Sequence, residues 1–171
     1  MSNKIVFILG SSRGDGETRA MVDEARTLVD ADFIDLNDYR IEYYDYEYRN
    51  RDDDFYPLIE RLTNDYDTLV FATPIYWYSM AAVMKTFFDR ISDLIRIYKD
   101  TGRKLRGKRM ALMSCASEAK MIEEFPMPFK RSADYLGMTF LGNVHGYLEN
   151  GQLPHEVKQD IREFVDLIQK T

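Results

Sequence analysis

Five short apolar runs alternate along the chain with segments whose apolar residues recur at helical spacing. The runs cover residues 4–9, 31–36, 67–73, 110–115 and 138–145. Helical spacing covers residues 18–29, 55–62, 79–98, 128–136 and 157–168. Strands that alternate with helices form parallel sheets through right-handed crossovers, because each helix returns the chain to the starting edge of the sheet. The alternation therefore predicts an α/β protein with helices on both faces of one parallel sheet.

A parallel sheet of five strands in a chain of 171 residues fits the doubly wound, flavodoxin-like order 2-1-3-4-5, a three-layer sandwich. In such sheets, ligands bind beyond the carboxyl ends of the strands, where the winding reverses. This rule places the loops after the first and third strands next to each other. Because no repeat or linker marks a second unit, residues 1–171 are predicted to form a single domain.

The loop after the first apolar run is rich in glycine and hydroxyl groups and leads directly into a helix. It reads Gly10-Ser11-Ser12-Arg13-Gly14-Asp15-Gly16-Glu17-Thr18. The first N–H groups of a helix have no partner within the helix, and the helix dipole adds positive potential there. Such a point binds anions, most often phosphate. Ser11, Ser12, Arg13 and Thr18 are of the side-chain types that bind phosphate.

Three known phosphate-loop motifs do not fit this stretch. A Walker A loop needs a lysine followed by serine or threonine, and residues 10–18 contain no lysine. The G-x-G-x-x-G fingerprint fails because Arg19 stands where its third glycine belongs. A phosphatase loop needs a nucleophilic cysteine, and the single cysteine, Cys115, belongs to another strand. The loop is therefore predicted to bind phosphate without cleaving it.

The loop after the third apolar run, Pro74-Ile75-Tyr76-Trp77, combines a proline with two large aromatic side chains. Flat aromatic ligands bind against such walls, where backbone groups also hydrogen-bond the edge of a ring. On the residues alone, Tyr76 and Trp77 fit a ligand wall and a place in a core or an interface about equally well. The adjacent phosphate site favours a ligand, and a phosphate with a flat ring on this fold points to flavin mononucleotide (FMN).

Two motifs resemble those of the NADPH-dependent FMN reductase family, which belongs to the flavodoxin-like superfamily. Residues 10–18 are similar to the family's G-S-x-R-x-x-[GS]-N-T loop. Residues 73–77, with Ser79-Met80 and residues 84–90, are similar to its S-P-I-Y-W/Y…K-x-F-x-D-R segment. The order of elements also matches nearly end to end. The resemblance implies bound FMN, a hydride taken from NADPH or NADH, and a homodimer.

Carried over position by position, the resemblance assigns three groups of residues to FMN. Ser11, Arg13, Gly16, Glu17 and Thr18 would bind the phosphate. Pro74, Ile75, Tyr76 and Trp77 would hold the ribityl chain and the isoalloxazine ring. Ser114, Cys115, Ala116 and Ser117 would line the far side of the ring. No catalytic side chain and no metal are expected, because the flavin performs the redox chemistry.

The sequence departs from the family pattern in two places. Glu17 stands where the family commonly has asparagine, and a carboxylate beside a phosphate dianion is unfavourable. We expect Glu17 to point outward or to cap the helix, so that only its N–H meets the phosphate. The loop after the fourth strand also lacks a glycine pair.

Composition excludes several functional classes. A net charge of −6 argues against a nucleic-acid partner, and the basic cluster at 103–109 is expected to be a solvated loop, with attraction of a phosphorylated dinucleotide as the alternative. One cysteine allows no internal disulfide and no cysteine-ligated metal site, which suits the cytoplasm. No apolar stretch is long enough for a membrane span or a signal segment.

The sequence also predicts the roles of several segments outside the proposed ligand site. The tyrosine-rich segment, residues 38–54, is expected to pack over a neighbouring subunit or a site mouth, with disorder as the alternative. Asp54 is expected to cap the next helix, and Asp89-Arg90 to form a helix-surface or dimer pair. The apolar stripe of residues 79–98 is wide enough to meet a partner subunit. His145 is a weak candidate for substrate contact.

The function predicted from these features is that of an FMN-dependent NAD(P)H oxidoreductase. It would pass electrons from a nicotinamide through FMN to a small-molecule acceptor such as a quinone, a free flavin, or an azo or nitro compound. One alternative is a flavodoxin-type electron carrier, but residues 10–18 lack the T-x-T-G-x-T loop usual in flavodoxins. The other is a flavodoxin-like protein that has lost FMN, for which Glu17 is the only hint.

Overall fold

The computed structural model describes residues 3–170. Its strands are Ile5–Leu9 (β1), Asp32–Asp35 (β2), Thr68–Tyr76 (β3), Ser79–Met80 (β4), Arg109–Cys115 (β5) and Thr139–Gly146 (β6). Its α-helices are Glu17–Arg26 (α1), Phe55–Asp65 (α2), Ala82–Arg96 (α3), Lys99–Arg103 (α4), Met127–Leu136 (α5) and His155–Gln169 (α6). A 3₁₀ turn, Leu36–Asp38 (η1), follows β2. No helix in this range is long and apolar enough to cross a membrane.

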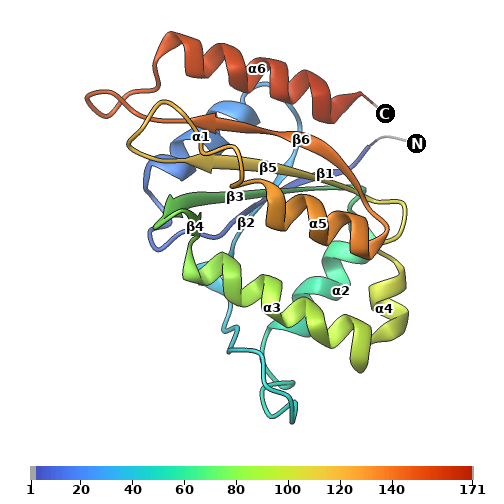
Figure 1. The fold of residues 1–171 in the computed structure, drawn as a ribbon. Coiled ribbons are helices and arrows are strands. Elements are labelled where there is room, and N and C mark those ends of the chain that lie inside the picture. Colours follow the sequence, from blue (N-terminus) through green and yellow to red (C-terminus); the bar gives the residue numbers. More distant parts are fainter. Residues whose placement is uncertain (1–2, 171) are drawn as a thin grey trace.

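The strands form one sheet with helices on both faces (Figure 1). The order is β2-β1-β3-β5-β6, and every neighbouring pair in it is parallel. The short β4 lies off this path and pairs antiparallel with the end of β3. When β4 is set aside, the order is the predicted 2-1-3-4-5, so the flavodoxin-like fold is confirmed.

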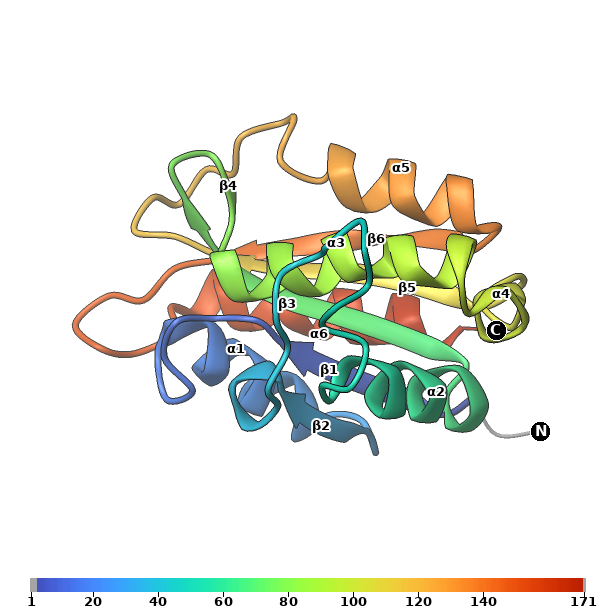
Figure 2. The ribbon, with the colours of Figure 1, turned by 90° about the horizontal axis from the view of Figure 1, so that it is seen from below.

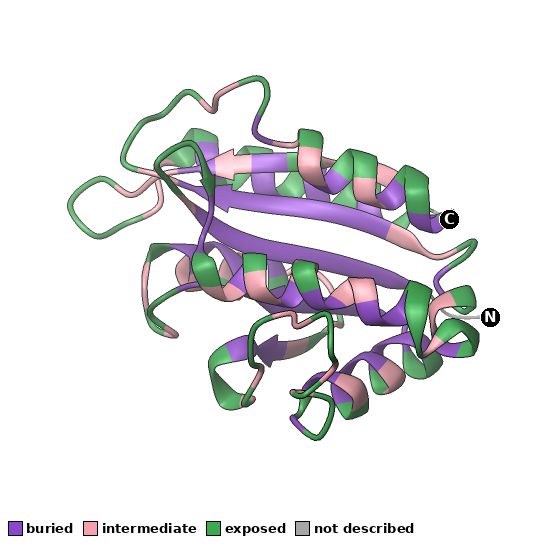
Figure 3. Cartoon of the chain, turned by 60° about the horizontal axis from the view of Figure 1, so that its bottom comes forward, coloured by how far each residue is buried: buried purple, intermediate pink, exposed green. Residues whose placement is uncertain are grey.

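The inner strands are buried on both faces of the sheet, because successive side chains of a strand point to opposite sides. Val6 and Ile8 of β1 pack in one core, which also holds Phe87 of α3 and the buried residues of α2 and α5. Phe7 and Leu9 pack in the other core, with α1 and α6. Figure 3 shows these strands buried along most of their length. This double burial explains why the apolar runs are continuous rather than alternating.

The third strand is longer than the sequence predicted. β3 continues through Pro74 to Tyr76, and the chain turns at Trp77 and Tyr78 into β4. The strand was predicted to end at Thr73 because proline seldom occurs inside a central strand. That prediction was wrong. Here β1 ends opposite Ala72, so that only β5 lies beside β3 at Pro74. Proline is tolerated at such an edge position.

The tyrosine-rich segment folds against α3 around one buried arginine. Arg90, only 2% exposed, forms ion pairs with Asp53 and Asp93. Its guanidinium also donates to the carbonyl oxygens of Glu42 at 3.0 Å and Asn50 at 3.3 Å, which lie on the two arms of the segment. The prediction that Arg90 lies on the helix surface was therefore wrong. The expected contact of this segment with a second subunit stays a prediction.

Side chains at two other predicted positions have different partners from those expected. The Asp54 carboxylate accepts the N–H of Arg40 at 2.7 Å and makes no cap hydrogen bond to α2. Its neighbour Asp53 instead accepts the N–H of Phe55 at 3.0 Å, so the predicted cap was displaced by one residue. Within the basic cluster, Lys108 is half-buried and donates to the Tyr66 carbonyl, so a fully solvated loop was also wrong.

Candidate functional site

The loops that follow β1, β3, β5 and β6 gather at one edge of the sheet (Figure 2). The first of them reaches the third strand directly, because the N–H of Gly10 donates to the carbonyl of Ala72 at 2.8 Å. A Cβ atom on Gly10 would lie 2.8 Å from Cβ of Met84 at the start of α3. Only glycine fits so close to another backbone, so Gly10 lets the two predicted loops lie next to each other.

The loop of residues 10–16 presents donors around the start of α1. Gly16 is the N-cap residue and has no side chain to occupy the N–H groups of the first helical turn. The Ser11 side chain is buried and its hydroxyl accepts the N–H of Arg13 at 3.3 Å. Ser12 and Arg13 are exposed, whereas Thr18 is buried. This set of N–H, hydroxyl and guanidinium donors has the chemistry of a phosphate site.

Two residues that the sequence analysis missed hold this loop from behind. The Asn37 amide donates to the Ser11 carbonyl at 2.8 Å and to the Asp35 carboxylate at 2.9 Å. Asp35 is buried, and its Oδ2 lies 2.5 Å from the position that a Cβ on Gly14 would take. Their place in the sequence could have identified them, because polar residues at the end of the second strand lie at the same sheet edge as the loop.

The turn between β3 and β4 exposes three aromatic rings. Tyr76 is 44% exposed, Trp77 94% and Tyr78 76%, so Trp77 is not a core residue of this chain. Trp77 has φ 49° and Tyr78 φ 67°, which is the backbone of a type I′ turn without its usual Asn or Gly. Positive φ at bulky residues costs about 1–3 kcal/mol each and is concentrated at binding sites. Tyr78 was missed, although it directly continues the aromatic run.

The base of this hairpin is fixed by buried groups. The Thr73 hydroxyl accepts the N–H of Ala81 at 3.1 Å, which ties the two ends of the hairpin together. Pro74 is buried and Ile75 is half-buried, so both support the hairpin from below. The exposed rings are therefore held on a rigid base.

The predicted residues after β5 divide into buried and accessible ones. Ser114 and Cys115 are buried within β5, Ala116 is half-buried and Ser117 is exposed. The first two therefore present little side-chain surface to a ligand at this edge. The structure thus brings all three predicted groups to one edge, but with unequal side-chain access.

His145 supports the loop after β5. Its Nε2 lies 2.9 Å from the carbonyl oxygen of Glu118, and its Nδ1 lies 2.9 Å from the Ser114 hydroxyl. Because a carbonyl only accepts, Nε2 carries the proton, and in neutral His145 the Nδ1 atom accepts from Ser114. His145 therefore connects β5, β6 and the loop between β5 and α5.

The Glu17 carboxylate reaches from α1 to the end of β5, where it lies 3.9 Å from Sγ of Cys115. Burial and the nearby Glu17 carboxylate raise the pKa of the Cys115 thiol to about 12. The thiol therefore stays protonated near neutral pH and is a poor nucleophile. Glu17 makes no cap hydrogen bond to α1, and its side chain is exposed; the expectation that only its N–H meets a phosphate stays a prediction.

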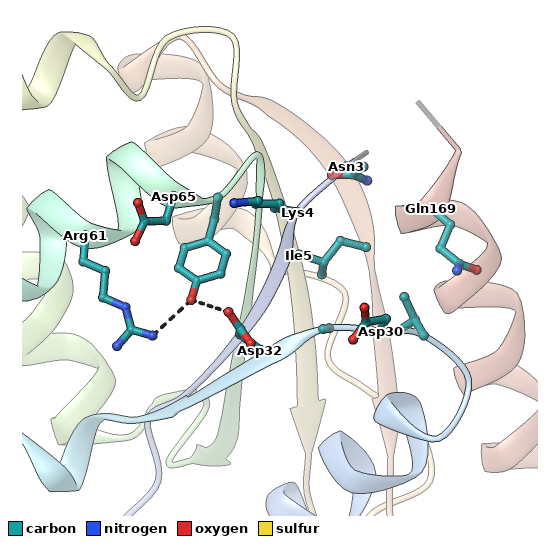
Figure 4. Close-up of a pocket in the computed structure, with 11 residues that line it drawn as sticks. Asn3, Lys4, Ile5, Asp30, Asp32, Arg61, Asp65 and Gln169 are labelled. Atoms are coloured by element: carbon teal, nitrogen blue, oxygen red, sulfur yellow. Dashed lines mark hydrogen bonds between the residues drawn. The ribbon is translucent and has the colours of Figure 1, made fainter. Parts of the chain in front are cut away.

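A hollow of about 660 Å³ lies at the opposite edge of the sheet, where β1 and β2 begin (Figure 4). Arg61 donates to the Tyr66 hydroxyl at 3.2 Å, and that hydroxyl donates to Asp32 at 2.6 Å. These bonds tie α2 to the edge strand β2. The hollow contains none of the predicted site residues. Residues 3–170 also contain no group of three or more His, Cys, Asp or Glu that could hold a metal ion.

The fold is flavodoxin-like, and the loop at the switch point of its sheet carries donors of the types that bind phosphate. The model of the NADPH-dependent FMN reductase family matches residues 3–152. The chain belongs to this family, whose cofactor is FMN and whose electron donor is NAD(P)H.

Individual relatives agree with this assignment. YwqN of Bacillus subtilis, provisionally named an NAD(P)H-dependent FMN-containing oxidoreductase, is 29% identical over 167 residues, covering 92% of this chain and 90% of YwqN. The Trp repressor binding protein from Bacillus subtilis superposes with a TM-score of 0.74 at 26% identity, covering 98% of this chain and 99% of that protein. General stress protein 14 from Treponema denticola, solved with FMN, shares the fold, with a TM-score of 0.67, 19% identity, and coverage of 97% and 99%.

Proposed function

We propose that this protein is an FMN-dependent NAD(P)H oxidoreductase that reduces a small-molecule acceptor. One structural observation supports the proposal independently of family membership. Gly10 donates its N–H to Ala72 of β3 and lies against Met84 of α3, so the loop after β1 adjoins the strand and the helix that flank the exposed aromatic hairpin. A phosphate and a flat ring in one ligand match these two features.

The residues have distinct parts in this proposal. Arg13, Ser12 and the free N–H groups of the first turn of α1 bind the phosphate, with Asn37 holding the loop in place. The rings of Tyr76 and Trp77 contact the isoalloxazine, and the backbone after β5 borders its far side. When bound, the flavin accepts a hydride from the nicotinamide and passes electrons on. The protein orients the ring and excludes water from one of its faces.

The acceptor is a quinone, a free flavin, or an azo or nitro compound in this proposal. Such acceptors are flat and conjugated, so they stack on a ring that is open on one face. The exposed hairpin supports an open face, because Trp77 and Tyr78 leave most of their surface uncovered by the rest of the chain.

We also propose that the protein works as a homodimer. An apolar hollow of about 250 Å³ lies between α3 and α5, lined in part by Phe88, Ile91 and Tyr135. Tyr135 is 75% exposed and Ile95 is 42% exposed on the same face. A second copy that covers this face would bury these side chains. Sedimentation analysis that finds only monomers at micromolar concentration would contradict this part.

Flavin binding is tested with flavin-free protein and a matched pair of variants. We expect FMN to raise the melting temperature of the wild-type protein and to lose fluorescence on binding. Trp77→Ala removes a ring of the proposed wall and should weaken FMN binding about tenfold, a change of about 1.4 kcal/mol within the range of an aromatic contact. Tyr43→Ala removes a ring that is 76% exposed in the tyrosine-rich segment, and it should leave binding unchanged.

Turnover is then measured as NADPH oxidation in the presence of FMN and each class of acceptor. Tight FMN binding without NADPH oxidation would favour the electron-carrier alternative. No response to FMN at all would refute the proposal.

A further inference from the structure

The phosphate loop carries more negative than positive side-chain charge. Arg13 is its one basic residue, while Asp15 and Glu17 are acidic. Arg19, in the next turn, is paired with Asp23 at 2.8 Å. Among residues 3–170, no salt bridge joins Glu17 or Arg13 to a residue of opposite charge. Glu17 is therefore an uncompensated anion at the start of α1.

The Glu17 carboxylate is close enough to the proposed ligand site to affect binding there. Glu17 is the first residue of α1, and its Oε2 lies 3.9 Å from Sγ of the buried Cys115. The carboxylate thus lies between the start of α1 and the end of β5, inside the edge where the predicted ligand groups meet. Glu17 is exposed, so its carboxylate is both open to solvent and within reach of a ligand bound at that edge.

A phosphate bound at the first turn of α1 would share that turn with the Glu17 carboxylate. The helix dipole and Arg13 attract the phosphate, whereas Glu17 repels it. An uncharged hydroxyl at the same place would feel almost none of this repulsion. The net advantage of a phosphate over a hydroxyl is therefore smaller than the donors of the loop alone would give.

We propose that Glu17 sets how strongly this site discriminates between phosphorylated and unphosphorylated flavin. The carboxylate weakens the binding of FMN and leaves that of riboflavin, which lacks the phosphate, nearly unchanged. The ligand class of the site then includes flavin nucleosides as well as the mononucleotide. This inference rests on the proposed function, since it requires that flavin binds at this edge.

The test measures dissociation constants of FMN and riboflavin for flavin-free protein by the quenching of flavin fluorescence. Glu17→Gln keeps the size of the side chain and removes its charge. We expect this variant to bind FMN about tenfold more tightly, as for removal of one nearby like charge, with riboflavin changed less than twofold. The gain should shrink at high salt, because exposed charges are screened.

Two further variants serve as controls. Arg13→Ala should have the opposite effect, because it weakens the binding of FMN more than the binding of riboflavin. Asp30→Asn removes the same charge beyond the far end of α1, where it lines the hollow at the opposite edge, and should change neither constant.

The possible outcomes separate the two proposals. If Glu17→Gln changes both flavins by the same factor, changes neither, or weakens FMN, this inference is wrong while flavin binding stands. If the wild-type protein binds neither flavin, both the inference and the proposed function are refuted.

Discussion

Replacing Arg90 with leucine should destabilise the protein strongly although Arg90 touches no part of the proposed ligand site. The side chain is 2% exposed, and its partners Asp53 and Asp93 are 6% and 3% exposed. Burial acts to lower the pKa of Arg90, but the hydrogen bonds that Arg90 donates to Asp53 and Asp93 outweigh it, so that the pKa is raised and the guanidinium stays charged. The variant leaves two buried carboxylates without their cation.

The magnitude follows from the cost of breaking a buried ion pair, about 3–5 kcal/mol. For a chain of 171 residues, each kcal/mol corresponds to about 2–4 °C in melting temperature. We therefore expect Arg90→Leu to lower the melting temperature by about 6–20 °C. Arg96→Leu, an exposed position on the same helix, should cost about 1 kcal/mol or less.

Thermal unfolding by circular dichroism compares the two variants directly. Limited trypsin digestion adds a local readout, because Arg90 holds the carbonyls of Glu42 and Asn50 on both arms of the tyrosine-rich segment. Cleavage after Arg49 or Arg51 should become faster in Arg90→Leu than in Arg96→Leu. If the two variants unfold within about 1 kcal/mol of each other, the network does not stabilise the fold as argued.

Two further predictions concern the phosphate loop and the buried thiol. Asn37→Ala removes the 2.8 Å hydrogen bond to the Ser11 carbonyl, a loss of about 0.5–1.5 kcal/mol, and should weaken FMN binding about two- to tenfold. Asn64→Ala, an exposed control, should bind FMN like the wild-type protein in the same fluorescence titration. Because the pKa of Cys115 is raised to about 12, the unfolded chain releases this proton at lower pH, and stability should fall by about 1.4 kcal/mol per unit from pH 9 towards 12. Urea unfolding of Cys115→Ala should show a slope smaller by this amount, because tyrosines with raised pKa, such as Tyr66 and Tyr147, still contribute, and an equal slope in both proteins would contradict the assignment.

The features that sequence reasoning found are those that depend on contiguous residues. The apolar runs showed the alternation of strands and helices, because strand and helix periods differ over only a few residues, and this alternation fits the doubly wound order of the sheet. Residues 10–16 and the start of α1 form one local unit, so the phosphate-type loop was visible without knowledge of any distant contact.

The missed features depend on contacts between residues far apart in the chain. Arg90 and Asp53 are separated by 37 positions, and neither position alone shows a buried pair. Asn37 donates to the Ser11 carbonyl from 26 positions away, and neither residue alone indicates this contact. The Asn37 contact becomes visible only when the fold places β2 beside β1, and the Arg90 contact only when the tyrosine-rich segment lies against α3.

Other errors have local causes. Pro74 suggested a strand end, and Trp77-Tyr78 is an unusual sequence for a type I′ turn, so the β3–β4 hairpin had no recognisable signal. Cys115 lies in a continuous apolar run, which indicated its burial, but sequence alone did not show that the Ser114 side chain is buried while Ser117 is exposed.

The central claim is that this chain holds a flavin that a nicotinamide reduces. The most direct test mixes the FMN-loaded protein with NADPH under anaerobic conditions and follows the yellow flavin absorbance. We expect rapid bleaching, and return of the colour when a quinone, a free flavin, or an azo or nitro acceptor is added. Colour that persists in the presence of excess NADPH and NADH would contradict it.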